Sequence, residues 1–313
     1  MIGRRALLLG GGVLLAGCTV GEGTIWLPWT APSPLPVEAA PELPHQLATA
    51  TALAQHLLDH GRAWKLTALQ TDTLEWFIKA LDEHLQVLLS DDPARRQRVN
   101  TALPQVAKPT QRTAAATYAA LSSLLTRLRV EHVGRALPAT GPAALLWASL
   151  AAFSGTMALR LPTGLRRRGD DLAELTPDLT ATTRDQVLAL SLQATHSYEM
   201  ALAATDLSKA QRTRLHLRLA GWRTLRESIL ALAPEVMASP PPIGYDVRPA
   251  RNAGQAYALS ETAETAALPI LGAWLAGTGS AAERRLGIQA LVATSTACVD
   301  VGGAALRWPG WPG

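Results

Sequence analysis

Apolar residues recur at steps of three and four along most of the chain after residue 44, which is the spacing of one face of an α-helix. The clearest stripe lies in residues 65–90 and consists of Leu66, Leu69, Leu74, Phe77, Ile78, Leu81, Leu85 and Leu88. A second stripe lies in residues 209–232 and consists of Leu215, Leu219, Trp222, Leu225, Ile229 and Leu232. No segment shows the alternation of apolar and polar residues that is typical of a half-buried strand. The pattern therefore predicts an all-α protein.

Glycine, proline and short polar runs divide these stripes into eight expected helices, in two sets of four. The first set is 45–60, 65–90, 111–133 and 142–160, and the second set is 183–205, 209–232, 251–275 and 281–306. Pro269 should kink the seventh helix, because its ring removes the hydrogen bond back to Thr265. Two short hairpins joined by a longer Pro-rich crossover are typical of a four-helix bundle. We therefore expect two antiparallel helical bundles, in a first domain at 45–160 and a second at 181–313, joined by a linker at 161–180.

The N-terminal residues have the layout of a secretory signal. Arg4 and Arg5 precede an apolar run, and Gly17 stands directly before Cys18. This stretch resembles the lipobox of bacterial lipoproteins. The resemblance implies cleavage of a signal at 1–17, a lipid on the Cys18 thiol, and a mature protein anchored at the outer face of the cytoplasmic membrane. Two arginines suit the general and the twin-arginine export routes equally, so the route stays open.

Composition narrows the class of protein. The signal is followed by a Pro-rich stretch at 18–44 that is typical of a semi-rigid tether. Hydrophobic residues make up 48% of the chain, which is enough to build a core, and the formal charge of +4 is too small to favour nucleic acid as a partner. With Cys18 lipidated, the second cysteine, Cys298, has no intramolecular partner, and its helical context predicts a small buried apolar residue.

The second half carries several distinctive stretches: 191–198 (SLQATHSY), 222–227 (WRTLRE), the Pro-rich crossover with Tyr245, and the ending at 308–310 (WPG). In these stretches, residues 181–313 resemble a ferritin-like domain of uncharacterised function found in exported actinobacterial proteins and lipoproteins. The resemblance implies an antiparallel four-helix bundle, a location in the cell envelope and no established activity.

Ferritin-like metal sites take Glu from two helices and a Glu-x-x-His motif from each of two others, and no expected helix holds that motif. Members of the family often carry an acidic residue where this chain has Thr195, and a histidine where it has Trp222, which argues against a working metal site. Four residues could still hold iron, manganese or zinc: His196, Glu199, Glu261 and Glu264. The alternative is that they are solvated or hydrogen-bonded within the bundle and that the protein has no cofactor.

A second candidate metal site consists of His56 and His60, which lie one helical turn apart. This spacing can hold Zn²⁺ or another transition ion, although the sequence shows no evident third ligand. The alternative interpretation is electrostatic, because a histidine in the last turn before Gly61 interacts favourably with the helix dipole.

No catalytic motif stands out from the sequence. A Gly-x-Ser-x-Gly nucleophile motif is absent, and no strand is expected that could carry one. We therefore expect a membrane-anchored lipoprotein of the cell envelope with a non-catalytic binding or scaffolding role, whose partner is an envelope protein or a small molecule. Two alternatives stay open: a metal-binding redox or storage protein, and a binder of an apolar small molecule held between helices near Pro269.

Overall fold

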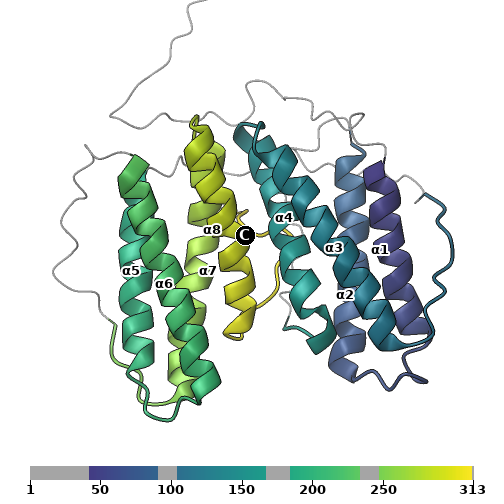
Figure 1. The fold of residues 1–313 in the computed structure, drawn as a ribbon, viewed down its shortest axis with the longest axis horizontal. Coiled ribbons are helices and arrows are strands. Elements are labelled where there is room, and N and C mark those ends of the chain that lie inside the picture. The colour runs from purple at the N-terminus through teal and green to yellow at the C-terminus, as the bar shows by residue number, and fades with distance from the viewer. Residues whose placement is uncertain (1–41, 91–103, 167–183, 233–246, 312–313) are drawn as a thin grey trace, which may run out of the picture.

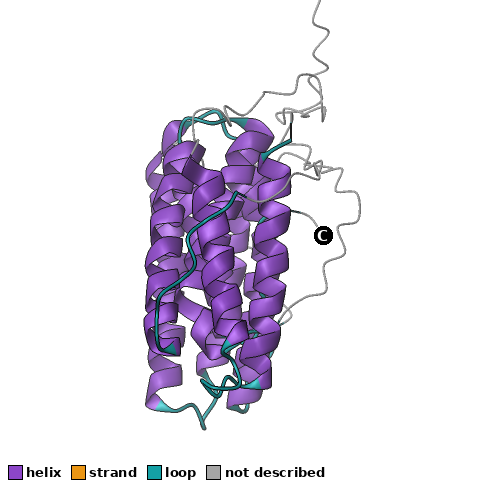
Figure 2. Ribbon diagram, turned by 90° about the vertical axis from the view of Figure 1, so that its right-hand side faces the viewer, coloured by secondary structure: helices purple, strands orange, loops and turns teal. Residues whose placement is uncertain are grey.

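The computed structural model describes residues 42–90, 104–166, 184–232 and 247–311, and within these ranges the long elements are all helices, with no strand (Figure 2). The first half holds α1 (Glu42–Asp59), α2 (Ala68–Leu88), α3 (Ala114–Ala136), α4 (Gly141–Arg160) and the short 3₁₀ turn η3 (Leu161–Thr163). The second half holds α5 (Arg184–Leu202), α6 (Lys209–Leu232), α7 (Ala253–Gly277) and α8 (Ala281–Asp300). The predicted all-α fold is confirmed. The predicted signal, the lipidated Cys18, most of the tether and most of the linker lie outside the described residues.

Local side-chain chemistry sets where the helices begin and end. Helix α2 begins with a capping box, in which Thr67 and Gln70 each bond the other's backbone N–H. Helix α8 ends at Asp300 and not at residue 306, where the apolar pattern places its end. The reason is Gly302, whose φ of 99° reverses the chain so that the N–H of Gly303 bonds the Cys298 carbonyl at 2.8 Å.

The eight helices form two bundles that lie side by side (Figure 1). Helices α1 to α4 make the first bundle and α5 to α8 the second, and α4 packs directly against both α7 and α8. One hydrophobic cluster runs through both bundles without interruption. In the part of the chain that is described, Gly141–Thr163 is the one segment long and apolar enough to cross a membrane, and 89% of its most apolar window is buried inside the protein. The central position of α4 therefore accounts for its composition.

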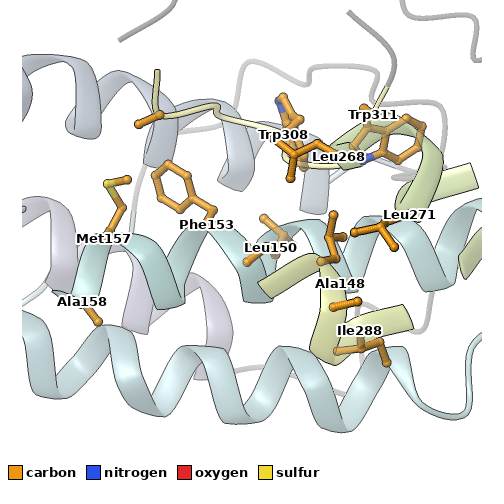
Figure 3. Packing of buried hydrophobic residues seen from close by; sticks show 14 of the residues in the cluster. Ala148, Leu150, Phe153, Met157, Ala158, Leu268, Leu271, Ile288, Trp308 and Trp311 are labelled. Atoms are coloured by element: carbon orange, nitrogen blue, oxygen red, sulfur yellow. The ribbon is translucent and has the colours of Figure 1, made fainter. Parts of the chain in front are cut away.

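The segment 301–311 follows α8 back between the bundles as a tail. Trp308 and Trp311 are both buried, and Figure 3 shows them beside Leu268 and Leu271 of α7, over α4. The tail lies so close to α7 that only glycine fits there. A Cβ placed on Gly272 would lie 1.9 Å from the carbonyl oxygen of Gly310.

Polar contacts tie the tail to the first bundle. The Glu83 carboxylate of α2, which is 2% exposed, accepts hydrogen bonds from the Arg307 guanidinium at 3.0 Å and from the Trp308 indole. The neighbouring His84 ring bonds the carbonyl of Arg307 at 2.8 Å and contacts the Trp308 ring edge-on. The tail thus contacts α2 through charge and α7 through close backbone packing, so it joins the two bundles.

We expect Gly272→Ala to lower the free energy of unfolding by about 1–3 kcal/mol, because the new methyl group forces the tail away from α7. Gly134→Ala in α3 is the matched control, since a Cβ there meets nothing within 4 Å. It should instead raise stability by about 0.5–1 kcal/mol, through the better helix propensity of alanine. Chemical denaturation of the two variants measures both changes. Equal stability of G272A and the wild type would show that the tail does not depend on this close approach.

Candidate functional site

The centre of the second bundle is a buried carboxylate, Glu264, with no exposed surface. Its Oε1 accepts hydrogen bonds from the Tyr198 phenol at 2.6 Å and from the Trp222 indole at 3.0 Å. The Arg218 guanidinium donates to both carboxylate oxygens, from Nε to Oε1 at 2.8 Å and from Nη2 to Oε2 at 2.7 Å. The Glu264 carboxylate therefore accepts four hydrogen bonds from this chain, three at Oε1 and one at Oε2.

Arg218 extends the same network across the bundle. Its Nη2 also donates to the Thr294 hydroxyl at 2.7 Å, and its guanidinium carbon lies 4.5 Å from the centre of the Trp222 ring. Burial alone lowers the pKa of Arg218, but the adjacent Glu264 carboxylate outweighs this and raises it. Burial, and then the same carboxylate, raise the pKa of the Tyr198 phenol, so Tyr198 stays a protonated donor. All four helices α5 to α8 meet in this network.

The predicted metal ligands of the second bundle are not brought together. Glu264 is held by Arg218, while Glu199 lies on the surface and pairs with Arg223 at 2.7 Å. His196 and Glu261 are both half-buried. Within the described ranges, no three His, Cys, Asp or Glu side chains are grouped so that they could hold a metal ion. The sequence left open whether Glu264 is solvated or bonded within the bundle, and it could not show that the Arg218 guanidinium lies beside it.

The other candidate metal pair, His56 and His60, is engaged in local contacts. His56 Nε2 lies 2.9 Å from the carbonyl oxygen of Gln111, and His60 Nδ1 lies 3.0 Å from the His56 carbonyl. The His60 ring stacks on Trp64 with 4.8 Å between centroids. These contacts support a role in fixing the end of α1 and the segment that precedes α3.

Three further buried titratable groups, His84, His132 and Cys298, are held in their neutral forms. Burial lowers the pKa of His84 to about 4 and that of His132 to about 3, so neither ring is charged near pH 7. Burial also raises the pKa of the Cys298 thiol, whose sulfur lies 3.5 Å from the Thr265 hydroxyl. A buried, protonated thiol is a poor nucleophile. Cys298 is therefore a packing residue, as its sequence context predicts.

The sequence offers the interior near Pro269 as a place for an apolar ligand, and in the structure the tail packs against this part of α7. Helix α7 continues through Pro269, and its neighbours Leu268 and Leu271 are buried against the tail (Figure 3). On the same helix, Gly272 packs closely against Gly310 of the tail.

An apolar groove of about 850 Å³ lies instead on the surface between the two bundles. Helix α8 forms its floor, and α3 of the first bundle and α6 of the second form its walls, on either side of α8 in Figure 1. The floor presents Ile288, Val292, Ala293 and Ala297, and the walls present Val130 and Leu217.

Two features of the groove walls point to a ligand. Val130 and Leu217 are apolar side chains that are 63% and 70% exposed. Arg129 and Arg285 also line the groove, and neither has a hydrogen-bond or ion-pair partner among the described residues. Sequence reasoning missed this site because its walls come from different bundles.

We expect Glu264→Gln to destabilise the protein by about 3–5 kcal/mol, because it leaves the buried Arg218 guanidinium without its counter-charge. Glu199→Gln is the matched control, since it breaks the ion pair with Arg223, whose two side chains are 42% and 48% exposed. The control should cost less than about 1 kcal/mol. Thermal and urea unfolding of both variants tests this. If the two substitutions cost the same, the buried network is not what holds the second bundle together.

Comparisons with known proteins add no family assignment. No family model matches the chain, and neither does any curated protein or any solved structure. The functional conclusion therefore depends on the groove and on the buried network themselves, and the ferritin-like resemblance stays a prediction.

Proposed function

We propose that this protein is a non-catalytic binding protein of the cell envelope that holds an apolar ligand in the groove between its two bundles. The observation that carries the proposal is the groove itself. Its volume of about 850 Å³ falls within the range of small-molecule sites, roughly 300–1,000 Å³. Its floor carries four apolar residues of α8, Ile288, Val292, Ala293 and Ala297.

Covering the exposed apolar side chains of the groove supplies the free energy for binding a ligand. Covering apolar surface contributes about 25 cal/mol per Å², and Val130 and Leu217 are mostly uncovered in the protein alone. Exposed apolar patches framed by polar residues commonly mark binding sites. The ligand class that follows is a molecule with a substantial apolar part.

The groove is also held open by the rest of the fold. Its two walls belong to different bundles, and the packing of α4 against α7 and α8 keeps those bundles together. A ligand therefore does not need to order the protein when it binds, which preserves affinity.

The proposed location follows from the N-terminal signal. A lipid on Cys18 and the Pro-rich tether at 18–44 would hold the bundles near the outer face of the membrane. Membrane-derived apolar molecules are abundant there. The buried Arg218–Glu264 pair supports a structural role for the centre of the second bundle, and no observation favours the metal-binding alternative.

We expect the full chain to bind the neutral fluorescent probe N-phenyl-1-naphthylamine saturably at one site, and Ala293→Phe to weaken that binding by roughly tenfold or more. Ala293 is an exposed residue of the groove floor, so a larger side chain fills the groove without disturbing the core. Ala220→Phe is the matched control, because Ala220 is exposed on α6 outside the groove. It should leave the affinity unchanged. Absence of saturable binding, or equal affinity in A293F and the wild type, would contradict the proposal.

A further inference from the structure

A small polar pocket adjoins one end of the apolar groove. Its volume is about 260 Å³, and it shares two lining residues, Arg214 and Asp300, with the groove. The remaining wall comes from the segment that follows α4 and from the glycine turn after α8. The two cavities therefore lie next to each other, with a mostly apolar one along α8 and a polar one at its C-terminal end.

The polar pocket carries an excess of positive charge. Arg160, Arg166 and Arg214 all line it, and Asp300 is its one carboxylate. That carboxylate is already engaged, because Arg160 Nη2 donates to Asp300 Oδ2 at 2.7 Å. Among the charged residues that line the pocket, two guanidinium groups thus lack a compensating anion.

The contacts of these two guanidinium groups are long and uncharged. Arg214 donates to the Tyr257 hydroxyl and to the backbone carbonyl of Asp300, both at 3.3 Å. Arg166 donates to the carbonyl of Gly302 at 3.2 Å. An anion would therefore gain stronger, charge-assisted hydrogen bonds than those the arginines make in its absence.

The backbone around the pocket is fixed and leaves room. The N–H of Ala305 bonds the Arg166 carbonyl at 2.9 Å, and the N–H of Leu165 bonds the Thr73 hydroxyl at 2.9 Å. Gly302 and Gly303 form part of the wall, and a Cβ placed on Gly302 would meet nothing within 4 Å. The arginine-bearing segment is held in place before any ligand arrives.

We infer that the groove and the polar pocket together bind one single-chain amphiphile with an acidic head group. The apolar chain lies along α8, and the acidic head accepts hydrogen bonds from Arg214 and Arg166. This inference rests on the proposed function, because it needs an apolar ligand in the groove. A free small anion would not use the groove, and a neutral apolar molecule would not use the arginines.

The test is displacement of the neutral naphthylamine probe by decanoate and by decanol at about pH 8, where the carboxyl group is ionised. The protein is the chain from residue 18 onward with Cys18→Ser, so that no attached lipid competes. We expect Arg214→Gln to raise, by roughly tenfold, the decanoate concentration that displaces half of the bound probe. The decanol concentration that displaces half of the probe should stay unchanged. Arg127→Gln is the control of equal charge change, because Arg127 is exposed on α3 outside both cavities. It should affect neither ligand.

The outcomes separate the two claims. Failure of the probe to bind would overturn the proposed function and with it the inference. If the probe binds but R214Q and R127Q change its displacement by decanoate equally, the proposed function stands. The inference that Arg214 binds an acidic head group is then overturned. Inorganic phosphate at matched ionic strength should leave decanoate binding unchanged. Competition by micromolar phosphate would instead identify a free-anion site and overturn the amphiphile.

Discussion

The burial of α4 on nearly all its sides is the constraint on which the rest of the molecule depends. A helix this apolar must be covered, and here the covering comes from both bundles together, with α3 on one side and α7 and α8 on the other. This packing fixes how far α3 stands from α6. The groove, which is the space left between those two helices over α8, is therefore a consequence of how the central helix is buried.

Each bundle also contains a buried carboxylate that accepts hydrogen bonds from an arginine and a tryptophan. In the second bundle Glu264 is held by Arg218, and in the first bundle Glu83 is held by Arg307 of the tail. Removing either partner would leave a charge buried without compensation, which costs far more than the pair gains over apolar residues. These pairs hold specific helices and the tail in place. The chemistry available to a ligand is on the outside, where arginines remain without a counter-charge.

The sequence predicted the elements well and the assembly poorly, for physical reasons. Helical periodicity is a local property, so the helix that carries the apolar stripe in 65–90 could be predicted from the sequence. The early end of α8 had a local signal in Gly302, but the apolar pattern that continues beyond it belongs to the tail. The contact between Glu264 and Arg218 joins residues 46 positions apart, and its partners depend on how helices pack. The groove depends on two bundles at once, which no local pattern encodes.

The most direct test of the central claim is methyl NMR of the protein, labelled at isoleucine, leucine and valine, during titration with decanoate. The account predicts that the methyl signals of Val130, Leu217 and Ile288 shift together and saturate. Leu57 and Leu271, buried away from the groove, should not move. Shifts at Leu271 without shifts at Ile288 would place the ligand inside the bundle beside Pro269, and would contradict a binding site between the two bundles.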